Sequence, residues 1–172
     1  MPELFCLRLP KSAAGTYEYA IISASSVQET HHGSLAAAEV VAQAAGRRSI
    51  AVVPGHEVLI TRVWLPTRRR SRIAQALPYA LEEQLTNDID DLHFAIRRVD
   101  GDGGVHAAVV DHAAMQRWRD ELGELAELGL EVVALVPENG LLPVSERRWQ
   151  VLADAEQAVL ALGGEGFALE SA

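Results

Sequence analysis

The sequence predicts an α+β fold in which strand-rich segments lie on both sides of a central helix. Residues 73–85 carry Ile or Leu at every fourth position, which is one apolar helix face. Short apolar runs separated by turn residues precede this helix. A strand, a glycine-rich turn, a strand, a helix and a further strand are expected after it. With 172 residues and 49% hydrophobic content, the chain can form a packed core.

Two strands and a helix are expected at the start of the chain. Residues 3–9 and 18–23 are typical of strands, and the Pro and Gly in the loop between them indicate an antiparallel pair. Ser34 is suited to cap a helix that runs to Ala45 and ends at Gly46. The predicted inner face of this helix consists of Leu35, Ala38, Val41, Ala42 and Ala45.

Two more strands are predicted at 49–53 and 57–65, with Pro54-Gly55 as a turn. One face of the second strand consists of Val58, Ile60, Arg62 and Trp64. The apolar face of the central helix consists of Ile73, Leu77, Leu81 and Leu85. Pro78 removes a backbone hydrogen bond inside this helix at a cost of about 3 kcal/mol. We therefore expect a kink or a restart near Leu77.

The second half of the chain begins with a predicted hairpin of strands at 92–99 and 105–110, joined by a glycine-rich turn. The next helix has a face that consists of Met115, Trp118, Leu122 and Leu125. A strand at 130–136 follows, so the order of elements favours a right-handed βαβ crossover. Strands at 149–152, 158–162 and 167–169 then suggest the start of an unfinished unit, whose uncovered edges predict a dimer.

The composition excludes several classes of function. A net charge of −9 and a pI near 5.1 argue against nucleic acid as a partner, because phosphates attract positive surfaces. The single cysteine, Cys6, cannot form an internal disulfide, which fits a reducing compartment. No apolar run approaches the roughly 20 residues of a membrane span, and no signal peptide is recognisable. We expect the chain as given to be soluble.

Candidate catalytic and metal-binding residues lack the spacing that such sites need. The six histidines have neither HExxH nor cysteine-paired spacing, so packing or surface roles are expected. Asp100, Asp102 and Asp111 resemble part of a calcium loop, but Gly104 occupies the next ligand position. A GxSxG elbow, a P-loop and a GxGxxG fingerprint are all absent from the sequence. We predict no catalytic residue, no cofactor and no metal.

Two charged segments are candidate contacts with a partner. The basic one contains Arg68, Arg69 and Arg70 at a helix start, and it is either a solvated face or a docking site for acidic protein or anionic lipid. The acidic one contains Glu82, Glu83, Asp88, Asp90 and Asp91, directly before the predicted strand. Its charge would steer a basic partner and protect an edge strand from aggregation, and the alternative is a solvated loop.

Four stretches carry a resemblance to a known family. They are VVPGHEVLITRVWLP, RRSRIAQALPYALEEQLTNDIDDLHFAI, AAVVDHAAMQRWRDEL and LGLEVVALVPE. Together they resemble the cytoplasmic domain of the type II secretion system L protein. The resemblance implies an actin-like fold with residues 1–66 as a first RNase H-like subdomain. Residues 67–136 would be an inserted α+β subdomain, and 137–172 the beginning of a second, truncated RNase H-like subdomain.

The resemblance also implies a function. The family consists of bitopic inner-membrane proteins that recruit the secretion ATPase through that ATPase's N-terminal domain and contact other inner-membrane platform proteins through regions absent here. It predicts a non-catalytic scaffold for protein export at the cytoplasmic face of the bacterial inner membrane. The predicted contact residues are Glu82, Glu83, Asp88, Asp90, Asp91, Leu92, Phe94, Arg68, Arg69 and Arg70.

Two alternatives stay open: a nucleotide-binding actin-like ATPase, and an actin-like adaptor of pilus biogenesis that binds a peptide of a membrane partner. Members that use nucleotide place an acidic residue and a glycine in the first turn of each half, where backbone amides approach the phosphates. The first such turn here, LRLPKSAAGTYEYA, has no aspartate. In the second, Ala155 and Glu156 follow Asp154 where glycine is needed. The sequence therefore predicts neither tight ATP binding nor hydrolysis.

Overall fold

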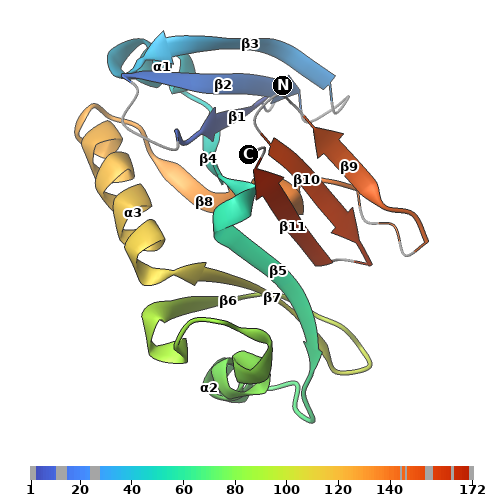
Figure 1. The fold of residues 1–172 in the computed structure, drawn as a ribbon. Coiled ribbons are helices and arrows are strands. Elements are labelled where there is room, and N and C mark those ends of the chain that lie inside the picture. Colours follow the sequence, from blue (N-terminus) through green and yellow to red (C-terminus); the bar gives the residue numbers. More distant parts are fainter. Residues whose placement is uncertain are drawn as a thin grey trace. The chain divides into compact units, whose positions relative to one another are not determined.

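In the computed structural model, the strands form two sheets, one of five strands and one of six (Figure 1). The described residues are 3–10, 15–23, 28–143, 145, 147–153, 157–163 and 165–170. The chain divides into two compact units, Met1–Pro54 with Gln116–Glu138, and Gly55–Met115 with Asn139–Ala172. These units follow other boundaries than the subdomains implied by the resemblance, whose limits at 66 and 136 stay a prediction.

The first unit contains the five-stranded sheet. Its elements are β1 (Glu3–Arg8), β2 (Thr16–Ser23), β3 (Gln28–Ala36), α1 (Ala37–Ala44), β4 (Arg48–Val53), most of α3 (His112–Glu127) and β8 (Val132–Pro137). The strand order is β3-β2-β1-β4-β8. The first three strands are antiparallel neighbours, so the predicted hairpin is confirmed, whereas β4 and β8 add in parallel. The largest buried side chains of this unit include Phe5, Leu7, Val40, Trp118 and Leu125.

The predicted helix cap at Ser34 is wrong. Ser34 pairs with Glu18 inside β3, and α1 begins only at Ala37. Because β3 pairs along the whole of β2, the sheet partner stabilises a strand in a segment with weak strand propensity. The inner face of α1 shifts accordingly, since Val40 and Ala44 are its buried residues.

The predicted βαβ crossover is also wrong. The strand before α3, β7 (Gly104–Asp111), belongs to the six-stranded sheet, whereas β8 belongs to the five-stranded one. Helix α3 therefore connects two sheets. The partner of β8 is β4, which is distant in sequence, and the local order of elements does not reveal such a pairing.

The second unit contains the six-stranded sheet, in the order β6-β7-β5-β11-β10-β9. Its further elements are the 3-10 turns η1 (Gly55–Glu57), η2 (Glu82–Gln84), η3 (Ile89–Asp91) and most of η4 (Glu138–Gly140), the helix α2 (Arg70–Leu81), and the strands β5 (Val58–Trp64), β6 (Leu92–Val99), β9 (Gln150–Ala153), β10 (Gln157–Leu162) and β11 (Glu165–Glu170). The predicted hairpin of β6 and β7 is confirmed, as are the three C-terminal strands.

Helix α2 packs on one face of the β6–β7 hairpin (Figure 1). Ile73, Leu77 and Leu81 are fully buried, as their spacing predicts, against a strand face that includes Val105. The helix continues through Pro78 to Leu81, so of the two predicted outcomes the restart is wrong, and the kink stays a prediction. Each fully buried Leu or Ile contributes about 1.5–3 kcal/mol. Three of them together outweigh the cost of about 3 kcal/mol for an interior proline.

The C-terminal strands join the sheet through β11, where Gly166 pairs with Ile60 of β5. Asn139 reinforces this junction. Its side-chain Nδ2 donates to the backbone oxygens of Val58 at 2.8 Å and of Gly55 and Gly166 at 3.2 Å. The Asn139 residue is only 2% exposed. One edge that was expected to need cover from a partner is therefore covered within the chain.

Candidate partner-binding surface

The acidic residues predicted to contact a partner lie around two short 3-10 turns after α2. Glu82 and Glu83 are exposed in η2. Asp88 caps η3, because its Oδ1 accepts a hydrogen bond from the Asp90 backbone N–H at 3.0 Å. Asp90 and Asp91 are exposed in η3 itself. The sequence folds this way because aspartate favours the first position of such turns.

The acidic turns lead directly into β6, which is the outermost strand of the described sheet. The Leu92 backbone N–H donates to Ile89, and the Ile96 backbone oxygen accepts from Arg70 Nη2 at 3.1 Å. Both groups therefore point to the open side of the strand. Because backbone groups alternate along a strand, Phe94 also directs its N–H and C=O to this side. We call Glu82, Glu83, Asp88, Asp90, Asp91 and Phe94 the acidic edge surface. Leu92, which was also predicted to contact a partner, is only 9% exposed and packs in the core with α2.

A cavity of about 310 Å³ lies beside this surface. Its lining includes Gln84, Leu85, Thr86, Asn87 and Leu92 from the segment around the acidic turns, and His56, Glu57, Leu59, Val109, Val110 and Asp111 from the neighbouring strands and η1. The lining contains both polar and apolar residues.

Two arginines of the basic cluster donate hydrogen bonds to the β6–β7 hairpin. Arg68 Nη2 donates to the Gly101 backbone oxygen, and Arg70 Nη2 donates to the Ile96 backbone oxygen. Arg69 is exposed at the N-cap of α2. Two of the three arginines thus fasten the start of α2 to the β6–β7 hairpin.

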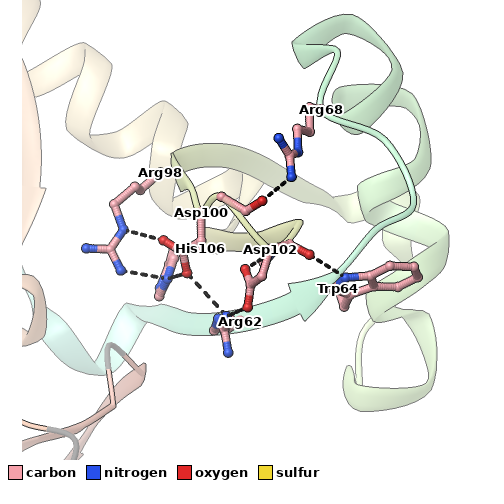
Figure 2. Close-up of polar contacts among 9 residues, drawn as sticks. Arg62, Trp64, Arg68, Arg98, Asp100, Asp102 and His106 are labelled. Carbon is pink, nitrogen blue, oxygen red and sulfur yellow. Dashed lines mark hydrogen bonds and ion pairs between the residues drawn. The ribbon is translucent and has the colours of Figure 1, made fainter.

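A second polar cluster lies on the hairpin, around the turn from Asp100 to Gly104 (Figure 2). Arg62 Nη2 lies 2.9 Å from Asp102 Oδ2 and 3.3 Å from Asp100 Oδ2. His106 Nε2 lies 2.8 Å from Asp100 Oδ2 and 2.9 Å from Arg98 Nη2. The Trp64 indole Nε1–H donates to the Asp102 backbone oxygen at 2.8 Å.

This cluster lowers the pKa values of both aspartates. The hydrogen bond with His106 is the main cause that holds the pKa of Asp100 below its usual value, with Arg98 and Arg62 acting in the same direction. For Asp102, the main cause of the lowered pKa is the backbone N–H of Gly104, which donates to Oδ1 at 2.9 Å. Both carboxylates are thus committed to the turn. The spacing of Asp100 and Asp102, which resembles part of a calcium loop, is explained by these contacts within the turn.

Two glycines make the turn possible. Gly103 has a φ of 95°, and an added Cβ would lie 2.9 Å from Trp64 Nε1. An added Cβ at Gly104 would lie 2.5 Å from Arg62 Nη2. These contacts are missed by sequence reasoning. The available signal is the placement of Arg62 and Trp64 at alternate positions of a strand whose other residues, apart from Thr61, are apolar.

Metal and membrane sites are not found within the described residues. No group of His, Cys, Asp or Glu side chains in the described ranges has a geometry suited to a metal ion. Among the helices that the structure describes, none combines the length and apolarity needed to cross a bilayer. Asp154, Ala155 and Glu156, which the sequence places in a second phosphate turn, lie outside the described residues.

Comparison with known proteins identifies the family. The type II secretion system (T2SS), protein L family matches residues 5–171. The chain belongs to this family. Type II secretion system protein L of Pectobacterium carotovorum subsp. carotovorum is 32% identical over 150 residues, which cover 85% of this chain and 34% of the relative. Protein L of Dickeya chrysanthemi is 32% identical over 168 residues, covering 95% of this chain and 41% of the relative.

The fold agrees with this membership. The cytoplasmic domain of EpsL, an inner-membrane component of the type II secretion system of Vibrio cholerae, superposes with a TM-score of 0.77 at 21% identity. The match covers 98% of this chain and 71% of that domain. The predicted α+β class is therefore confirmed. The chain spans 34–41% of the length of the two protein L relatives above.

Proposed function

We propose that this protein L chain is a non-catalytic scaffold that recruits the secretion ATPase to the inner-membrane platform and so supports protein export. Membership of the family supports a place in the secretion system. The chain would act at the cytoplasmic face of the bacterial inner membrane. Other platform proteins would be contacted through parts of protein L that lie outside this sequence.

The acidic edge surface is the proposed contact with the N-terminal domain of the ATPase. The observation that carries this proposal is the exposure of Glu82, Glu83 and Asp90 beside β6, the outermost strand of the described sheet. Carboxylates steer a basic partner to the site, and the strand offers main-chain hydrogen bonds to an added segment. Arg68 and Arg70 have a supporting part, because they hold the hairpin on α2.

Charge reversal tests this contact. The triple variant Glu82→Lys, Glu83→Lys and Asp90→Lys should weaken binding of the ATPase N-terminal domain by about tenfold or more at low salt, since repulsion replaces steering. The matched control reverses three exposed carboxylates on another part of the chain, Glu124, Glu127 and Glu131. Both variants carry the same net charge. Equal affinities for the two triple variants would exclude the acidic edge surface as the contact.

The proposed lack of ATPase activity rests on the two turns that would approach the phosphates. The first has no aspartate to hold hydrated magnesium, and the second has Glu156 where a glycine would open the backbone. Titration calorimetry with Mg-ATP should give no saturable heat at micromolar concentrations. Saturable binding would favour the alternative of a nucleotide-dependent enzyme. Binding of the N-terminal domain of the secretion ATPase would favour the scaffold over the pilus-biogenesis adaptor.

A homodimer is proposed as a further property of the C-terminal strands. Their exposed apolar residues are Trp149, Val151, Leu152, Phe167 and Leu169. Trp149 and Phe167 are in contact, with ring centroids 6.0 Å apart, so part of this set forms a continuous apolar surface. Because Val151 and Phe167 both pair with Leu160, they lie on the same face as Leu169. Sedimentation at high micromolar concentration should show a dimer that Val151→Glu with Leu169→Glu converts to monomer. A wild-type chain that stays monomeric would contradict this property.

A further inference from the structure

A small pocket lies beside the turn of the β6–β7 hairpin, and the proposed function does not use it. It has a volume of about 310 Å³ and is lined by Arg62, Val63, Trp64, Asp102, Gly104 and Glu165. Side chains alternate along β5, and Leu65 lies in the core that α2 covers. The side chains of Trp64 and Arg62 therefore lie on the face of the sheet opposite α2. The pocket is separate from the acidic edge surface.

The aromatic wall of this pocket is exposed and held in place. Trp64 is 63% exposed, although tryptophan is one of the largest apolar side chains. Its indole Nε1–H is bound to the Asp102 backbone oxygen at 2.8 Å, as Figure 2 shows. The close approach of the ring to Gly103 restricts it further. An exposed tryptophan that is already ordered loses little side-chain freedom when a partner binds, and tryptophan is enriched among the residues that dominate interfaces.

The charges of the pocket favour a cation. The guanidinium of Arg62 is matched by Asp102 at 2.9 Å and by Asp100 at 3.3 Å, and it lies against the Gly104 backbone. An anionic ligand would have to displace these aspartates. The carboxylate of Glu165, by contrast, is exposed at the rim of the pocket. Because Asp102 is committed to Arg62 and the turn, Glu165 supplies the remaining charge among the lining residues, in a chain of net charge −9.

We propose that this pocket binds an arginine or lysine side chain of a protein partner. The cation lies over the face of the Trp64 ring, where the ring quadrupole attracts it, and Glu165 is its counter-ion. Arg62 and Asp102 take no direct part in the charge pairing. They keep the turn and the indole in position. Binding of a cationic side chain in this pocket does not depend on binding of the secretion ATPase at the acidic edge surface.

Nuclear magnetic resonance with short peptides tests the proposal on the whole chain. The probe is acetyl-Gly-Arg-Gly-amide, and the neutral control is acetyl-Gly-Gln-Gly-amide. The arginine peptide should shift the Trp64 indole N–H and the Gly104 amide with a dissociation constant on the order of 10–100 mM, because an exposed cation–π contact and ion pair together contribute about 1–3 kcal/mol. The glutamine peptide should leave both signals unchanged. Added salt should weaken the effect, because the Glu165 pairing is exposed to solvent.

Two variants separate binding from a general effect on the fold. Glu165→Gln should weaken the arginine peptide by about two- to fivefold, which is the range of an exposed ion pair. Glu127→Gln, the matched control on α3, should leave the affinity unchanged. Trp64→Leu should abolish the Gly104 shift while the spectrum of the rest of the chain is preserved. Equal shifts with both peptides, no shift up to about 100 mM peptide, or unchanged affinity in Glu165→Gln would overturn the proposal.

Discussion

Replacing Asn139 with alanine should loosen the attachment of β11 to β5 and destabilise the second unit. The Asn139 amide donates to three backbone oxygens, those of Gly55, Val58 and Gly166, in a site that is 2% exposed. Its two protons can form two full hydrogen bonds. Leaving a buried acceptor without its donor costs about 1–3 kcal/mol. We therefore expect a loss of about 2–4 kcal/mol, a large share of the stability of a typical domain.

Urea denaturation and hydrogen exchange measure this loss. The free energy of unfolding should fall by the stated amount. Amides of β5 and β11 should exchange faster than in the wild-type chain, and those of α2, which packs on the β6–β7 hairpin, should change less. The matched control is Asn87→Ala, because Asn87 is exposed and such changes alter stability by less than about 0.5 kcal/mol. The reasoning is refuted if Asn139→Ala is as stable as the control or if exchange in β11 is unchanged.

The Asp variant at the same position gives a pH signature. A carboxylate in Asn139→Asp has no proton to donate and faces three carbonyl oxygens, so the pKa of the new group is raised in the folded state. The neutral acid can still donate one hydrogen bond. Stability of this variant should therefore be highest below the unfolded pKa of about 3.9 and fall as the pH rises through the folded value. Asn139→Ala should show no such additional pH dependence.

Three further changes test other parts of the fold. Leu77→Ala should destabilise the second unit by about 2–5 kcal/mol in urea denaturation, because Leu77 is fully buried on the inner face of α2; a loss below about 1 kcal/mol would contradict the packing. His106→Ala should raise the pKa of Asp100 towards its ordinary value in a carboxyl NMR titration, whereas the pKa of Asp102, held mainly by Gly104, should change less. Because both pKa values are lowered in the folded state, the stability these carboxylates contribute is present above about pH 3.9 and is lost as the pH falls. Cys6 should react slowly with a thiol reagent at pH 8, since burial raises its pKa, and rapid reaction of the native chain would oppose this.

Local patterns predicted the parts of the fold that depend on neighbours in sequence. The four-residue spacing of Ile73, Leu77 and Leu81 identifies the buried face of α2, because a helix repeats every 3.6 residues. The glycine-rich turn before β7 likewise indicates the hairpin. These signals are complete within a short window of sequence.

Pairings between distant segments could not be predicted in this way. Nothing within the segment of β3 marks it as a strand, since its partner β2 provides the stabilisation. The sheet to which β8 belongs is decided by β4. Asn139 is one polar residue after a strand, and only the folded chain brings three carbonyl oxygens to its amide. The candidate sites show the same difference. The acidic turns can be recognised from the sequence alone, whereas the contact between Trp64 and Asp102 depends on the packing of two strands.

Hydrogen exchange of the chain with and without the N-terminal domain of the secretion ATPase tests the central proposal most directly. Binding at the acidic edge surface should protect amides between Glu82 and Arg98, with the Phe94 N–H among them, because an added segment would bond to the open side of β6. The β9–β10 strands should exchange as in the free chain. Protection confined to the C-terminal strands, or none at saturating ATPase domain, would contradict the account.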